Sequence, residues 1–309
     1  MATARREYFG KLLEPGLDDI FYNEYDAVPS MLPEIYNMGT SDQPFEEALS
    51  IGAMGTFPKF KGTVEYDRPY EGYSKIIEFP EYADGFKIER KLYDDDRYDI
   101  INQRPAGLAI QARRRRESDG ALLFNNAAST TATDIEGITV DISGGDGKAL
   151  CASDHPSKAP HGPTARSNTG TLKLNHTNLQ KTKNLMRRTV DDRGNKFSVV
   201  PDTLLVGIDQ EETAWELIQS EKKVNTAENN PNIHHGKYRL IVWDELADDD
   251  RWFLIDSRYA RLFLHWKDRV PLEFAMEEAF DELVAKYRAY MRYNSVFYDW
   301  VWVYGQFPA

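Results

Sequence analysis

One long helix constrains the fold of this chain more than any other feature of its sequence. Between residues 94 and 126, apolar side chains recur at spacings of three or four residues, or multiples of these, as on one helical face; they are Tyr98, Ile101, Leu108 and Ala112, and the stripe resumes at Leu122 and Leu123. Pro105 and Gly107 are expected to bend the helix. At about 1.5 Å per residue it would be about 45–50 Å long, nearly three times the usual length. Such a helix predicts an elongated, flat subunit.

The segment before this helix, residues 57–93, indicates β-structure. Strands are predicted at 74–80 and 86–92, and Asp84-Gly85 between them is a turn signal. Lysines, glutamates and tyrosines alternate along both strands. A two-stranded ribbon is marginally stable alone in water, so this one is expected to pack on something else.

The first 48 residues combine chain breakers with apolar side chains. The breakers forbid a long helix or a central strand; they are Pro15, Gly16, Pro29, Pro33, Gly39 and Pro44. A disordered arm would not carry so many apolar and aromatic residues; they include Phe21, Tyr22, Tyr25, Met31, Leu32, Ile35, Tyr36 and Met38. The pattern predicts an extended arm that lies across its own chain or a neighbour.

The middle of the chain alternates irregularly between short strands and helices, which favours the α+β class. After a loop-rich stretch with a strand pair near 138–142 and 148–152, helices are predicted at 175–189 and 210–223. Strands are predicted at 197–200, 203–206, 237–243 and 251–256, the last two flanking an acidic turn.

The final segment carries conflicting signals. From Leu272 to Tyr287 the apolar spacing fits a helix. From Ala289 the period changes to two, which is typical of a strand with two usable faces and leads to Trp300, Trp302 and Tyr304.

Composition and charge limit the classes of function that the chain can have. The chain has 309 residues, 41% of them hydrophobic, which is enough for a sizeable core. The net charge of −12 makes it a poor candidate for a dedicated nucleic-acid binder. Aromatic residues make up 12%; so many Tyr and Trp side chains fit either a contact surface between proteins or a Tyr-rich core.

Cysteine content and hydropathy bear on the compartment. Cys151 is the only cysteine, so disulfide frameworks and four-cysteine zinc sites are excluded. No apolar run approaches the roughly 20 residues that cross a bilayer, and no apolar signal core follows the N-terminus. An origin in a reducing cytosol is expected.

The candidate metal and phosphate motifs are weak. Cys151, His155 and His161 lack the spacing of a metal site, and His234-His235 would point to opposite faces of a strand. The acidic runs 94–96 and 248–250 lack a calcium-loop pattern. The glycine-rich stretch 143–148 does not match a phosphate-binding loop, and no nucleophile–base arrangement is present.

One basic run remains, Arg113 to Arg116. Four consecutive helical residues cover all sides of a helix, so ion pairing within or between subunits is favoured over nucleic-acid contact. The sequence therefore indicates contact surfaces and no catalysis.

The order of these parts resembles the major capsid proteins of tailed phages, in particular the Mu-like major head subunit family. The resemblance includes the loop Lys148-Ala149-Leu150-Cys151-Ala152-Ser153-Asp154-His155-Pro156, which Ser167-Asn168 follows, and the C-terminal Asp299-Trp300. It implies a non-enzymatic α+β subunit without metal or cofactor. It also favours long β-strands in place of the helix at 272–287. The choice between helix and strand stays open there, and a strand is expected after Asp281.

The resemblance also implies a division of the chain. Residues 1–48 would be an N-terminal arm, 49–92 an extended β-hairpin (the E-loop) and 93–171 a P-domain with the spine helix. Residues 172–265 would be the A-domain, and 266–309 would return to the P-domain sheet.

The implied function is that of a head subunit, which forms hexamers and pentamers and from these an icosahedral shell. The shell would enclose double-stranded DNA and contact it only non-specifically. Expected partners are other copies of the chain, a separate scaffolding protein, a portal and a decoration protein, with assembly in the bacterial cytoplasm and no membrane contact. The contact residues expected from the sequence are Tyr22, Tyr25, Lys59, Lys61, Arg68, Tyr70, Tyr73, Arg113, Arg114, Arg115 and Arg116.

Two alternatives stay open at this point. One is an encapsulin-type shell that packages an enzyme. The other is a soluble enzyme that uses Cys151 and His155. Covalent Lys–Asn cross-links are not expected, because no acceptor motif accompanies Lys59, Lys61 or Lys75.

Overall fold

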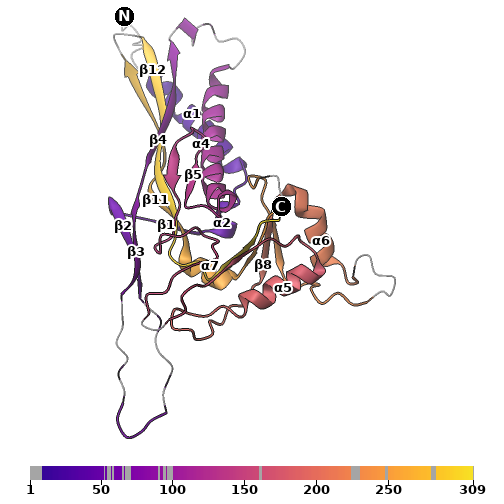
Figure 1. Ribbon diagram of the computed structural model, residues 1–309. Coiled ribbons are helices and arrows are strands. Elements are labelled where there is room, and N and C mark those ends of the chain that lie inside the picture. The colour runs from indigo at the N-terminus through magenta and orange to yellow at the C-terminus, as the bar shows by residue number, and fades with distance from the viewer. Residues whose placement is uncertain are drawn as a thin grey trace, which may run out of the picture.

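The computed structural model is an elongated body with a smaller sheet on one side and a hairpin extending from one end (Figure 1). It describes residues 9–51, 53, 57, 59–64, 66, 71–89, 91–92, 95, 100–159, 162–223, 230–247, 250–279 and 283–308. Two main sheets, of four and five strands, lie on either side of the C-terminal end of helix α4 (Ile100–Asn125).

The four-stranded sheet has the order β1-β11-β12-β4 and forms the long axis of the subunit. Its strands are β1 (Asn37–Thr40), β11 (Leu264–Ala279), β12 (Val284–Phe297) and β4 (Glu81–Glu89). All neighbours are antiparallel except β1, which runs parallel to β11. Helices α1 (Phe9–Ala27) and α4 cover one face of this sheet.

The prediction of a helix over 272–287, which rested on apolar spacing, is wrong. Strands β11 and β12 occupy the described part of this range. In β11, half-buried Leu272, Phe274 and Met276 alternate with exposed residues. Their side chains face α1 and α4. This alternation of period two is the pattern of a sheet with one covered face, and it coexists with helical spacing in the same residues.

Helix α1 corrects the expectation of an extended arm without a long helix. It runs through Pro15 and Gly16 and continues to Ala27. A proline inside a helix costs about 3 kcal/mol. Leu17 and Phe21 are fully buried against α4 and the long sheet, and burying each such side chain contributes about 1.5–3 kcal/mol. Tertiary packing therefore outweighs the local penalty.

Helix α4 confirms the predicted long helix, from Ile100 onward in the described residues. Ile101, Leu108 and Ala112 of the predicted stripe are buried, and Pro105 lies inside the helix. Near its C-terminal end, Gly120 lies so close to Leu32 that a Cβ atom would clash with the leucine side chain.

The predicted ribbon at 57–93 contains strands, but they do not pair with each other. Strand β3 (Glu71–Glu78) pairs with β2 (Phe45–Ile51), and β4 pairs with β12. The predicted turn at Asp84-Gly85 is therefore wrong, because both residues lie inside β4. Glycine is needed there for close approach, since a Cβ on Gly85 would lie 2.2 Å from the carbonyl oxygen of Tyr287.

The five-stranded sheet has the order β7-β13-β10-β8-β9. Its strands are β7 (Thr169–Gly170), β13 (Val303–Gln306), β10 (Trp252–Ile255), β8 (Thr203–Val206) and β9 (Arg239–Val242). Helices α5 (His176–Met186) and α6 (Glu211–Gln219) pack on one face, and the other face meets the end of α4. Short elements complete the fold: α2 (Leu32–Ile35), β5 (Thr131–Thr133), β6 (Thr139–Asp141), the 3-10 turn η1 (Ile208–Gln210) and α7 (Ser257–Phe263).

Predictions for this region are confirmed for the helices and for strands at 203–206, 239–242 and 252–255. The predicted pairings are wrong. β9 and β10 both flank β8 and do not pair across the acidic turn, and β6 pairs with β5, because 148–152 forms no strand. The segment 197–200 is also not a strand.

We expect Gly85→Ala to destabilise the subunit by about 1–3 kcal/mol, because a fixed backbone carbonyl, which cannot move aside like a side chain, meets the new methyl group. Urea denaturation of the unassembled chain measures this. Gly107→Ala is the matched control: it lies in α4 with open space around it and should stabilise the chain by about 0.5–1 kcal/mol. Equal effects of both substitutions would contradict the β4–β12 register.

Candidate assembly surfaces

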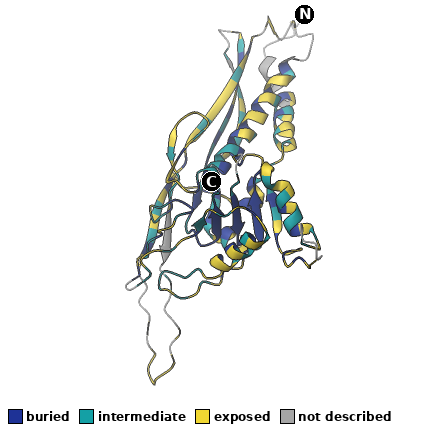
Figure 2. Ribbon diagram, turned by 45° about the vertical axis from the view of Figure 1, so that its right-hand side comes forward, coloured by how far each residue is buried: buried dark blue, intermediate teal, exposed yellow. Residues whose placement is uncertain are grey.

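The connection between β2 and β3 contains strongly exposed residues. Residues 59–64 lie away from the body in Figure 1 and are exposed in Figure 2. Phe57 is completely exposed and Tyr66 is 88% exposed, and Phe60 and Val64 are also solvent-facing. Exposed large apolar side chains that are close together in the chain are typical of a surface that another molecule covers.

The base of this hairpin is fastened to the body by three lysines. Lys75 Nζ bonds to Ser143 and lies 3.5 Å from Asp141 Oδ2. Lys158 Nζ donates to the carbonyl of Gly72 at 2.6 Å, and Lys267 forms an ion pair with Glu46. These contacts fix the direction in which the exposed connection leaves the body. Sequence reasoning missed Lys158 and Lys267, because their partners lie far away in the chain.

The hairpin residues expected as subunit contacts fall into three groups. Lys59 and Lys61 are exposed. Tyr73 is half-buried, and Lys158 Nζ lies 4.5 Å from its ring centroid. Arg68 and Tyr70 lie outside the described residues.

The two arm tyrosines lie on α1. Tyr22 is 41% exposed, and its hydroxyl accepts a hydrogen bond from the Phe274 amide at 3.2 Å. Tyr25 is half-buried under the guanidinium of Arg113, which lies 3.9 Å from its ring centroid. Part of the Tyr22 side chain therefore stays exposed, whereas Tyr25 packs mainly against Arg113 of its own chain.

The arginine run spreads around α4 as its helical spacing predicts. Arg113 donates to the carbonyl of Tyr25, and Arg114 is exposed. Arg116 is buried and makes a two-pronged ion pair with Asp268, at 2.9 and 3.0 Å.

Arg115 is buried and lies at the centre of a charge cluster that extends to the exposed Glu136. Its guanidinium bonds to Asp119 at 2.9 Å, Asp134 at 2.8 Å and Glu136 at 3.0 Å. Burial alone would lower the pKa of Arg115, but the carboxylates around it raise the pKa overall. Arg115 and Arg116 are thus buried in this chain and pair with carboxylates of their own subunit. Their expected role as contacts between subunits stays a prediction.

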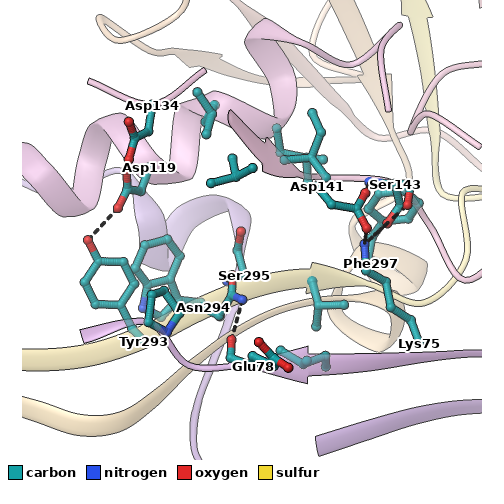
Figure 3. Close-up of a pocket in the computed structure, with 18 of the residues that line it drawn as sticks. Lys75, Glu78, Asp119, Asp134, Asp141, Ser143, Tyr293, Asn294, Ser295 and Phe297 are labelled. Atoms are coloured by element: carbon teal, nitrogen blue, oxygen red, sulfur yellow. Dashed lines mark hydrogen bonds and ion pairs between the residues drawn. The ribbon is translucent and has the colours of Figure 1, made fainter. Parts of the chain in front are cut away.

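A cleft of about 410 Å³ lies beside this cluster, between β3, α4, β6 and β12 (Figure 3). Tyr293 donates to Asp119 at 2.7 Å, and Asn294 donates to the Glu78 carbonyl at 2.6 Å. Burial raises the pKa of Asp119, despite the bonds from Tyr293 and Arg115. Arg115, Asp119, Tyr293 and Asn294, which lie at this cleft, are thus all engaged by partners within the chain.

The His-Pro loop and the Ser-Asn pair meet in a buried clamp. The Asn168 side chain accepts from the Ala152 amide at 2.9 Å and donates to the carbonyls of Leu150 and Val303. His155 lies between Asp146 and Asn168, at 2.7 and 3.1 Å, and stacks on Trp300. The clamp joins the loop after α4 to β13 of the smaller sheet.

This geometry removes the proposed Cys151–His155 enzyme site. Cys151 is buried, and burial raises the pKa of its thiol far above the usual range. Both ring nitrogens of His155 are engaged by Asp146 and Asn168. A reactive cysteine needs a depressed pKa and an accessible thiol.

His176 of α5 and His234 form a close pair that the sequence analysis did not predict. His234 is fully buried, and its ring lies 4.6 Å from that of His176, which is 58 residues away in sequence. Burial, His176, Lys183 and Lys237 lower the pKa of His234 to about 4. Within the described ranges no group of three His, Cys, Asp or Glu side chains could hold a metal ion. In the same residues no helix is long and apolar enough to cross a membrane.

We expect Asn168→Ala to destabilise the chain by about 2–4 kcal/mol, because it leaves buried partners of the clamp without hydrogen bonds. The shift of the urea midpoint measures this. Asn184→Ala, on the exposed side of α5, should change stability by less than about 0.5 kcal/mol. A midpoint for Asn168→Ala that matches this control would refute the clamp.

Acidification should destabilise the subunit through His234. The unfolded chain takes up a proton near pH 6.5 and the folded chain only near 4, so stability is full above about pH 6.5 and is lost as pH falls toward about 4. The urea midpoint at about pH 7 and about pH 5 should differ less in His234→Gln than in the parent chain. The exposed neighbour His235 is the control, and His235→Gln should keep the full pH dependence.

Solved structures similar to this subunit are shells. The capsid of a native GTA particle matches with a TM-score of 0.54 at 12% identity, over 91% of this chain and 92% of that one. The capsid of bacteriophage JBD30, decorated with minor capsid protein trimers, matches with a TM-score of 0.51 at 13% identity, over 71% and 92%. A virus-like particle from Pyrococcus furiosus matches with a TM-score of 0.52 at 9% identity, over 94% and 98%. These likenesses show the fold.

A family model carries the comparison further than the fold. No curated protein matches the chain. The model described as phage capsid protein matches residues 72–305, which is most of the sequence. The match includes α4, the clamp and both main sheets except β1 and the last residue of β13. The chain therefore belongs to the phage capsid protein family, and it is a structural subunit of a capsid.

Proposed function

We propose that this chain is the major head subunit of a tailed phage with Mu-like relatives, which assembles as hexamers and pentamers into an icosahedral shell around double-stranded DNA. The exposed connection between β2 and β3 carries this proposal. Phe57, Phe60 and Tyr66 have no partner to pack on among the described residues, although the base of the hairpin is firmly fastened. A neighbouring copy is the partner that would cover them.

The proposed parts follow the expected division with shifted bounds. The E-loop is the β2–β3 hairpin, residues 45–78, and not the stretch 49–92. The P-domain comprises α1, α4 and the four-stranded sheet, and the A-domain comprises the five-stranded sheet with α5 and α6. Tyr22, Lys59, Lys61, Arg114 and the half-buried Tyr73 are the proposed contacts with neighbours, and Tyr25 and Arg113 border this surface.

The proposed partners are further copies of the chain, a separate scaffolding protein, a portal and a decoration protein. Assembly in the bacterial cytoplasm is part of the same proposal. The net charge of −12 supports a wall that DNA touches without sticking, because like charges repel the phosphate backbone. The family model favours this role over an encapsulin-type shell, which a co-purifying cargo enzyme would reveal.

The double variant Phe57→Ser/Phe60→Ser tests the proposal. In the proposed shell each of these rings is buried against a neighbouring subunit, and this burial contributes about 1.5–3 kcal/mol per ring. Removing both rings should therefore raise the concentration needed for assembly by tenfold or more. Light scattering against concentration measures this threshold, and the urea midpoint of the unassembled chain should not move.

Thr63→Ala is the control in the same connection, because it is also exposed and changes little apolar surface. It should assemble like the parent chain. Unchanged assembly of the double serine variant would contradict a contact through this hairpin.

A further inference from the structure

Charge is segregated along the chain in the A-domain and in the loop that leads into it. From His155 to Val190 the sequence contains seven Lys or Arg residues and no Asp or Glu; they are Lys158, Arg166, Lys173, Lys181, Lys183, Arg187 and Arg188. From Gly207 to Glu221 it contains five acidic residues and no Lys or Arg; they are Asp209, Glu211, Glu212, Glu216 and Glu221. Helix α5 belongs to the basic stretch and α6 to the acidic one.

The fold places these two helices in one layer. α5 packs against β13, and α6 packs against β8 and β9, toward the other end of the same sheet face. Leu179 and Met186 of α5 share a core cluster with Ala214 and Ile218 of α6. The outer sides of both helices are exposed in Figure 2. One end of the layer is therefore basic and the other acidic.

Most of these charges have no ion-pair partner within the described part of the chain. Lys173 pairs with Asp250, but Lys181, Arg187 and Arg188 make no ion pair there, and neither do Glu211 and Glu212. The surroundings of the basic helix are themselves basic, because burial and the positive charges of Lys237 and Arg187 lower the pKa of Lys183.

Each helix also exposes one large apolar side chain among its charges. Trp215 of α6 is 58% exposed, three and four residues after Glu212 and Glu211. Leu185 of α5 is 44% exposed, between Lys181 and Arg188 at spacings of four and three. Such spacings place Glu211, Glu212 and Trp215 on one face of α6, and Lys181 and Leu185 on one face of α5. Arg188 lies in the turn that directly follows α5. The two faces are complementary, since each is an apolar centre with charges of one sign around it.

The helix dipole explains part of this arrangement and not all of it. Acidic residues in the first turn of α6 and basic ones near the end of α5 are favourable for each helix alone. The dipole gives no reason for an exposed tryptophan, which is enriched at the centres of protein interfaces. A buried apolar contact with charges around it is the usual anatomy of such an interface.

We propose that the α5 face of one copy docks on the α6 face of the next copy, with Leu185 against Trp215 and Lys181 and Arg188 against Glu211 and Glu212. This contact rests on the proposed function and names the A-domain partner in it. Two different faces of one domain make a head-to-tail contact, and such contacts close into rings when the rotation between copies allows it.

Cysteine cross-linking in assembled particles tests the contact while leaving its central residues intact. Asn184→Cys lies next to Leu185 on α5, and Gln219→Cys lies about one helical turn after Trp215 on α6. The natural Cys151 is buried and does not compete. A short bismaleimide should link the two variants into dimers when they are co-assembled, and each variant alone should give none.

The matched control replaces Asn184→Cys by Val200→Cys, which is 55% exposed in the same domain and lies outside both faces. It should give no dimer with Gln219→Cys. Particles that form normally without the α5–α6 dimer would overturn the docking and leave the proposed function standing. A chain that forms no oligomer under any condition would refute both.

Charge reversal gives a second test. Lys181→Glu/Arg188→Glu and Glu211→Lys/Glu212→Lys should each raise the assembly threshold about tenfold, because like charges then meet across the contact. The chain with all four reversals should assemble within about threefold of the parent, since the complementarity is restored. If the first pair assembled normally but its particles lost DNA, the α5 face would be a DNA contact and the docking would be wrong.

Discussion

An aromatic cluster at the C-terminal end of α4 holds the subunit together, and the rest of the structure depends on it. Phe124 is fully buried and makes edge-to-face contacts with Trp243 and Phe253 of the smaller sheet region, with Trp302 and with Tyr36. Such aromatic pairs contribute about 0.5–1.5 kcal/mol beyond their burial. The end of one long helix thus joins two sheets that share no strand. Most tryptophans serve this and neighbouring cores, so the high aromatic content reflects internal packing more than surface, with Trp215 the exposed exception.

Around this cluster, buried polar contacts set the directions of the projecting parts. The Arg115 carboxylate cluster and the Arg116–Asp268 pair fix α4 against the long strands. The Asn168 clamp fixes the loops that lead into the smaller sheet. A buried ion pair adds little net stability, but removing one partner is costly. These contacts therefore act mainly by holding the subunit in one geometry. A subunit that must fit its neighbours needs this fixed geometry more than it needs a large core.

The sequence predicted features that depend on local periodicity and missed those that depend on distant partners. The stripe through Ile101 and Leu108 predicted α4, because one helical face lies against a sheet. Pro15 wrongly excluded α1, since packing of Phe21 outweighs a local penalty. Asp84-Gly85 resembled a turn, although the glycine serves close strand approach. The spread of the arginines around α4 was predictable, but Asp268, 152 residues from Arg116, was not.

Two exposed features of the fold support the account of function. One is an anchored hairpin with exposed aromatic side chains, and the other is the pair of helices α5 and α6, whose outer faces carry opposite charge. The central claim is that other copies of the same chain cover these surfaces. Electron microscopy of the purified full-length chain, concentrated after size-exclusion with light scattering, tests it most directly. The account predicts closed shells, or rings and sheets built from the same hexameric units. A monodisperse monomer at every concentration and salt, with the hairpin still exposed to protease, would contradict it.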